Sequence, residues 1–179
     1  MFRDNSLIPT EAVRLASLAL LAEMPRRYGD LAAEVRHFTS CVTGPSLELM
    51  GTPLELLRLE GLVATPSGTG MADNAVLEIT EAGRAALLSL LRAQLRAPLG
   101  DMNRLALLLK LRFLHLMPAD ERIVQVAHIA ESLEGEIARL QDLRRGQDGA
   151  PQEFRAWLDQ DIAALETRLQ GLNRGAARP

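Results

Sequence analysis

The stretch that most constrains the fold runs from residue 43 to residue 83 and reads TGPSLELMGTPLELLRLEGLVATPSGTGMADNAVLEITEAG. A short apolar helix closes at Glu60-Gly61. Two runs with strand character follow, residues 62–65 and 75–79, on either side of a loop rich in turn-forming residues. Thr80 then supplies a helix start. A helix, a small hairpin and a capped helix in this order are typical of the recognition helix and wing of a winged helix-turn-helix, and we predict that fold.

The composition predicts a mainly α-helical protein. Aromatic residues make up only 3% of the chain and 47% of its residues are hydrophobic, so the core must consist of aliphatic side chains that suit helices. The single cysteine, Cys41, excludes an internal disulfide and a cysteine-rich zinc site. The sequence shows neither an export signal nor a run that could span a membrane. We therefore expect a cytoplasmic protein with no membrane partner, metal or cofactor.

Three helices are expected before the hairpin. The first runs from Thr10 to about Met24, and the second covers residues 26–38 and ends in a turn over residues 39–45. The third covers residues 46–60, or begins near Gly51-Thr52 if Pro53 occupies its first turn.

The C-terminal half should be helical throughout. Pro98-Leu99-Gly100 ends the helix that begins at Thr80, and an apolar helix over residues 102–116 and two long helices joined at residues 146–151 follow. Each long helix carries apolar residues at intervals of three and four, a spacing that packs lengthwise on another helix: Ile123, Val126, Ala130, Leu133, Ile137 and Leu140, then Phe154, Leu158, Ile162, Leu165, Leu169 and Leu172. We predict a DNA-binding domain over residues 1–97 and an antiparallel helical dimerisation domain over residues 98–179. Alternatively, the two stripes pack on each other within one chain.

Three groups of residues resemble the PadR family of transcriptional regulators. Leu54, Leu57 and Gly61-Leu62-Val63 are similar to that family's L-x-x-L-x-x-x-G-L-V, and residues 77–84, LEITEAGR, resemble its second wing strand and helix start. Residues 107–116 and 118–122 are similar to a run in its C-terminal helical domain. The resemblance implies a homodimeric cytoplasmic regulator, usually a repressor that binds a palindromic operator, whose C-terminal helices pair two subunits.

The charge pattern departs from that family. Residues 1–91 contain 7 basic against 11 acidic residues, whereas residues 92–179 contain 13 against 12. Gly51-Thr52 stand where the family has a Tyr-Pro pair, and residues 64–76 carry no cation. DNA-binding surfaces are usually basic. This pattern therefore also favours a protein that keeps the winged-helix fold but has little affinity for DNA.

Several polar side chains are candidates for DNA contact. Arg26, Arg27 and Tyr28, expected at the start of the second helix, could anchor phosphate, and the alternative is a solvated turn. The other candidates lie at the end of the second helix, on the third helix and in the wing: Arg36, His37, Ser46, Thr52, Arg58, Ser67, Thr69 and Asn74. Arg58 could contact guanine, but a surface ion pair with Glu55 or Glu60 is the alternative.

Trp157 is the only tryptophan. In relatives of the PadR family, aromatic residues at the dimer centre stack on planar effectors, so the resemblance makes Trp157 a candidate effector-binding residue; packing in the last helix is the alternative.

Two functions are consistent with these features. The first is a PadR-like DNA-binding regulator that is controlled by an effector of unknown identity. The second is a protein-binding adaptor or antirepressor that keeps the fold but has little DNA affinity. The sequence contains no nucleophile motif, glycine-rich phosphate loop or clustered histidines, so we do not expect an enzyme.

Overall fold

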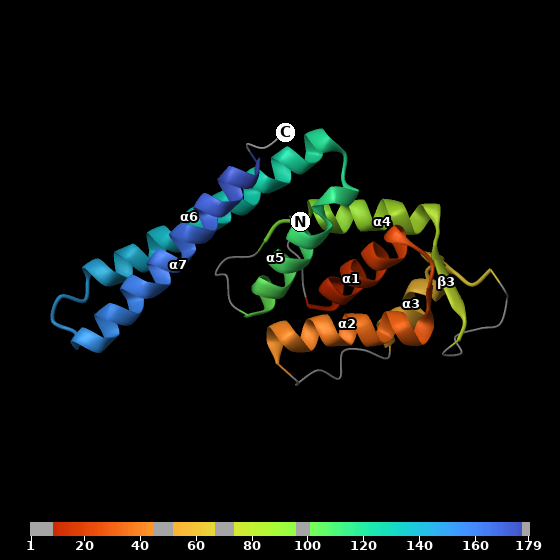
Figure 1. Cartoon of the computed structure of the whole chain (residues 1–179), viewed down its shortest axis with the longest axis horizontal. Coiled ribbons are helices and arrows are strands. Elements are labelled where there is room, and N and C mark those ends of the chain that lie inside the picture. Colours follow the sequence, from red (N-terminus) through yellow and green to blue (C-terminus); the bar gives the residue numbers. More distant parts are fainter. Residues whose placement is uncertain (1–8, 45–51, 67–73, 96–100, 177–179) are drawn as a thin grey trace, which may run out of the picture. The chain divides into compact units, whose positions relative to one another are not determined.

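The structure is a computed structural model that describes residues 9–44, 52–66, 74–95 and 101–176 (Figure 1). It is mainly helical with a small antiparallel sheet of three strands. The elements, in chain order, are α1 (Pro9–Glu23), β1 (Arg26–Arg27), α2 (Tyr28–Thr43), α3 (Thr52–Leu59), β2 (Val63–Ala64), β3 (Val76–Ile79), α4 (Glu81–Arg92), α5 (Asp101–Phe113), the 3₁₀ helix η1 (Leu114–Leu116), α6 (Ala119–Arg145) and α7 (Gln152–Ala176).

Helix α1 forms the centre of the N-terminal unit. Its apolar residues continue around the helix, so that Leu15, Leu18 and Leu21 are completely buried, as expected of a helix surrounded by protein. It packs against α2, α3, α4, α5 and β3, and Figure 1 shows it between α2 and α4. The other elements of this unit are therefore positioned by a shared apolar helix.

The sheet has the strand order β1-β3-β2, and both pairings are antiparallel. Val63 lies opposite Ile79, which confirms the predicted pairing of the two runs that flank residues 67–73. Strand β1 was not expected, since the sequence places Arg26 and Arg27 at the start of the second helix. They are instead paired with Leu77 and Val76 of β3, and the prediction was wrong.

Helix α3 ends in a backbone turn that leads into the sheet. Gly61 has a φ of 71°; its N–H bonds to Arg58 O at 3.0 Å, and Leu62 N bonds to Leu57 O at 2.8 Å. These two bonds form a Schellman motif, in which glycine adopts the left-handed conformation at little cost. The described part of the helix begins at Thr52, and residues 46–51, which the longer alternative includes, lie outside the described residues.

Thr80 and Gly83 fasten the start of α4 to this turn. The Thr80 hydroxyl accepts a hydrogen bond from Gly83 N at 3.0 Å and donates one to Gly61 O at 2.7 Å. A Cβ on Gly83 would lie 2.1 Å from Leu62 O, so only glycine permits this approach. The motif residues that resemble the PadR family are thus packing and capping residues.

Helix α2 is longer than the sequence predicted. The expected turn over residues 39–45 is helical as far as Thr43, and Cys41 lies on the exposed surface of the helix. Thr39 is buried, and its hydroxyl bonds to Val35 O at 2.9 Å. This internal bond satisfies the hydroxyl within the helix, although such residues also favour turns.

Helix α5 belongs to the N-terminal unit. The chain forms two compact units, one containing α1 to η1 and the other containing α6 and α7. Because α5 packs against α1 and α2, the boundary between the units lies at Pro118–Ala119, some distance beyond the boundary at residues 97 and 98 that we placed from the sequence.

Lys110 on α5 is the chain's only lysine and is 1% exposed. Its Nζ donates a hydrogen bond to Leu91 O at 2.6 Å and another to Ala93 O, at the C-terminal end of α4. Carbonyl groups at a helix end attract a cation. Burial nevertheless lowers the pKa of Lys110 to about 8, because the interior disfavours the charged form.

The second unit is a hairpin of α6 and α7, which pack lengthwise (Figure 1). The turn between them confirms the break predicted at residues 146–151. The buried side chains of α6 recur every four residues at Gln125, Ile129, Leu133 and Ile137, so only part of the predicted stripe is buried in the hairpin. None of the helices that the structure describes is long and apolar enough to cross a membrane.

Candidate nucleic-acid interface

One candidate surface is the outer face of α3. Leu54 and Leu57 point into the core, and Arg58 is exposed beside Leu59, whose exposure is 73%. Thr52 is the first residue of the helix that the structure describes. The exposed face therefore combines one cation, Arg58, with the acidic Glu55 and two apolar side chains.

An ion pair joins the C-terminal end of α3 to α1. Arg14 Nη1 and Nη2 donate to Glu60 Oε1 and Oε2 at 2.8 and 2.5 Å. The hydrogen bonds hold the pKa of Glu60 below its ordinary value and raise the pKa of Arg14. Glu60 therefore pairs with Arg14. From the sequence alone, Glu60 was a candidate ion-pair partner of Arg58.

In strand β1 the side chains of the two adjacent arginines lie on opposite faces. Successive side chains of a strand point to opposite faces, and here the side chain of Arg26 is 21% exposed, whereas Arg27 is exposed. Arg27 can contact an anion in solution. Arg26 is half-buried.

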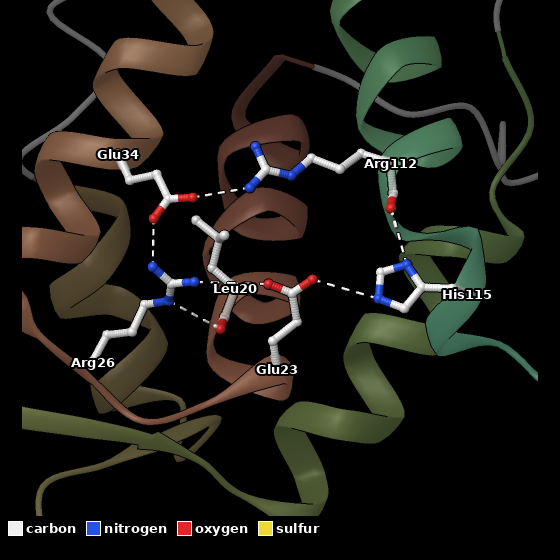
Figure 2. Close-up of polar contacts among 6 residues, drawn as sticks. All are labelled: Leu20, Glu23, Arg26, Glu34, Arg112 and His115. Atoms are coloured by element: carbon white, nitrogen blue, oxygen red, sulfur yellow. Dashed lines mark hydrogen bonds and ion pairs between the residues drawn. The ribbon is translucent and has the colours of Figure 1, made fainter.

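The guanidinium group of Arg26 is held by α1 and α2 (Figure 2). Its Nε donates to Leu20 O at 3.3 Å, and its Nη1 donates to Glu34 Oε2. Nη2 also lies 3.7 Å from Glu23 Oε2. Arg26 is therefore part of an internal network.

The same network reaches α5 and η1. Arg112 Nη2 donates to the second oxygen of Glu34 at 2.9 Å, while its guanidinium lies over the rings of Phe38 and Phe113 in a cation–π arrangement. His115 Nε2 lies 3.4 Å from Glu23 Oε1. Sequence reasoning missed these partners, since Glu34 and Arg112 are 78 residues apart and no local pattern connects them.

The remaining candidates on α2 differ in accessibility. Tyr28, the first residue of the helix, is half-buried, and its N–H bonds to Ala75 O at 2.9 Å. Arg36 and His37 are exposed, and Cys41 Sγ lies 3.9 Å from the His37 ring nitrogens. Arg36 and His37 can therefore reach a partner in solution.

The other predicted residues are dispersed. Asn74 is exposed just before β3, and Trp157 on α7 is 65% exposed. Ser46, Ser67 and Thr69 lie outside the described residues. Within the described ranges, no group of three His, Cys, Asp or Glu side chains could hold a metal ion.

Comparison with known proteins assigns the chain to a family. A family model described as "Putative AphA-like transcriptional regulator" matches residues 2–176, nearly the whole chain. A search of curated proteins finds no match. The chain therefore belongs to the AphA-like family of transcriptional regulators.

Proposed function

We propose that this regulator is a PadR-like, cytoplasmic DNA-binding protein with a winged helix-turn-helix over α1 to α4. In this proposal α2 and α3 form the helix-turn-helix, and β2 and β3 form the wing. The observation that carries the proposal is the turn at Gly61, which leads from α3 directly into the antiparallel strands while Arg58 and Leu59 stay exposed. A helix with its inner face packed and its outer face open is suited to enter the major groove.

The proposed DNA contacts combine phosphate anchors and base contacts. Arg27, Arg36 and His37 serve as anchors, and Arg58 reads a base edge. A mobility-shift assay at low salt on the DNA upstream of the protein's own gene tests this function. The absence of a shift there, together with no enrichment of genomic fragments by the protein, would reject it.

We further propose that two chains pair through α6 and α7 and repress a palindromic operator. The hairpin leaves apolar side chains in solvent near both ends, including Ile123 at 70% exposure and Trp157 at 65%. Because only part of the predicted stripe on α6 is buried within the hairpin, the remaining apolar side chains are available to pack against a second chain. Sedimentation of a monomer at micromolar concentration would contradict the pairing.

Trp157 is also the proposed site of a small effector. Its exposure leaves the indole ring accessible for stacking. Because it is the only tryptophan, its fluorescence reports binding directly. A Trp157→Phe variant that keeps effector-dependent release from DNA would remove the residue from this role. The proposal assigns the protein no catalytic activity.

A protein-binding adaptor or antirepressor is the second candidate function. The outer face of α3 favours it, because Leu56 and Leu59 are exposed beside the acidic Glu55. Leu59→Ser would weaken binding of a protein partner more than Arg58→Gln does. Under the DNA-binding proposal, the order of the two effects on DNA affinity is reversed.

A further inference from the structure

We propose that Glu34 is a positioning residue for DNA contact: through Arg26 it holds strand β1 so that Arg27 faces the phosphates. This inference rests on the proposed DNA-binding function and assigns different roles to two adjacent arginines. Arg26 is a structural anchor, and Arg27 is the contact.

The first support is the alternation along β1. The strand pairs with β3 at two positions, Arg26 with Leu77 and Arg27 with Val76. Because consecutive strand residues face opposite sides, fixing the Arg26 side chain on one side sets the direction of Arg27 on the other.

The second support is the number of groups that hold Arg26. Its guanidinium donates to a backbone carbonyl of α1, Leu20 O, and to a carboxylate of α2, Glu34 (Figure 2). A guanidinium has a rigid planar arrangement of donors, so two partners from different helices fix its orientation. Turning the guanidinium away from this position would break both bonds.

The third support is that Glu34 connects two arginines. Its carboxylate accepts one hydrogen bond from Arg26 and one from Arg112, each on a separate oxygen. Arg112 is itself placed by its stacking on Phe38 and Phe113. Glu34 thus links β1 to α5, and a glutamine in the same position would present an NH2 group, which cannot accept, to one of the two arginines.

The direction of the change in DNA affinity when a carboxylate is neutralised tests the proposal. A carboxylate on a DNA-binding domain repels phosphate, so its neutralisation raises DNA affinity in general. Asp30 lies one helical turn before Glu34 on α2 and is exposed. Asp30→Asn therefore supplies the same change of charge without breaking the connection to Arg26, and it serves as the matched control.

The experiment measures the affinity of the full-length protein for a short duplex that the wild-type protein selects from a random pool. Asp30→Asn should leave affinity unchanged or raise it, whereas Glu34→Gln should lower it by roughly threefold to tenfold, as expected from the loss of one hydrogen bond. Arg26→Lys keeps the charge but loses the planar donors, so it should reproduce the effect of Glu34→Gln. Circular dichroism establishes that each variant is folded.

A double variant separates positioning from general stability. Arg27→Gln should lower affinity and reduce the dependence of log affinity on log salt by about one unit for each contact. Adding Glu34→Gln to Arg27→Gln should cause no further loss, because Glu34 acts through Arg27. Two independent effects would instead multiply.

Three results would overturn the inference. If the losses of affinity caused by the two substitutions multiply in the double variant, Glu34 does not act through Arg27. An affinity of Glu34→Gln equal to or above that of Asp30→Asn would show that Glu34 restrains a cation from DNA. If the wild-type protein selects no duplex at all, both the inference and the proposed DNA-binding function fail, whereas the first two results leave that function intact.

Discussion

Replacing Lys110 with methionine should change the way in which stability depends on pH. Lys110 is the chain's only lysine, is 1% exposed, and donates hydrogen bonds to Leu91 O and Ala93 O. Methionine keeps the unbranched apolar stem but removes the amine. The comparison therefore isolates one buried charge.

The pKa gives the size of the effect. Burial lowers the pKa of Lys110 from 10.5 to about 8, and each unit corresponds to about 1.4 kcal/mol, so protonation costs the folded state about 3 kcal/mol. Between about pH 8 and the value of an unfolded lysine, the unfolded chain binds this proton and the folded chain has released it. The free energy of unfolding must therefore rise with pH across this window and stay lower below it.

The neutral amine keeps its structural role. It still has two N–H groups, enough for Leu91 O and Ala93 O. At about pH 7 the methionine variant gains about 3 kcal/mol by removing the charge, but loses about 1–3 kcal/mol for each carbonyl left without this donor. The two contributions nearly cancel. At about pH 10 most of the charge penalty has gone, so the wild-type advantage should grow by about 2.5 kcal/mol.

Urea unfolding of both proteins, followed by far-ultraviolet circular dichroism across this pH range, measures the difference. Other groups that titrate in the range are common to both proteins and cancel. Because the chain has one lysine, NMR of selectively labelled lysine also gives one side-chain signal to titrate. A stability difference that does not change with pH, or a lysine signal that titrates at the value of a free lysine, would refute the reasoning.

Three further outcomes follow from the contacts around α3 and α4. Gly83→Ala should destabilise the protein by about 2 kcal/mol or more, because the new Cβ meets Leu62 O at 2.1 Å; an unchanged urea midpoint would contradict this. Thr80→Ala should lower the free energy of unfolding by about 1 kcal/mol. Thr80→Ser should lower it much less, because serine keeps the capping hydroxyl. A double-mutant cycle of Arg14→Gln and Glu60→Gln should give a coupling of only about 0.5 kcal/mol, since both side chains are partly exposed. The pKa of Glu60 is lowered in the folded state, so this coupling is present at neutral pH and is lost as pH falls through that pKa; a coupling that persists in acid would contradict it.

The parts of the fold that sequence predicted depend on local signals. Gly61 marks the end of α3 and Thr80 the start of α4, and each acts through bonds to residues close in the chain or through its own backbone conformation. The break between α6 and α7 is also local. Such signals can be interpreted without knowledge of the three-dimensional arrangement.

The parts that it missed depend on distant partners. Helix α5 lies beyond the boundary predicted at residues 97 and 98, yet it packs on α1 and α2, because Leu105, Leu109 and Phe113 complete the same core. Lys110 lies among these apolar residues, and nothing near it in sequence indicates that it meets the end of α4. Helix α4 ends at Arg92, before the predicted proline-glycine signal, and the end of a helix does not by itself mark the end of a packing unit.

The candidate site illustrates the same distinction for charge. Sequence reasoning treated Arg26 and Arg27 as one phosphate anchor because they are adjacent, and a two-residue strand has no pattern that would separate them. The strand exists only because β3, fifty residues later in the chain, pairs with it. That pairing sends Arg26 to Glu34 and leaves Arg27 exposed. Charge counts along the N-terminal half include both members of internal pairs such as Arg26 with Glu34 and Arg14 with Glu60. Such pairs contribute little to the field outside the molecule, so affinity for phosphate should follow the few exposed arginines more closely than the net charge.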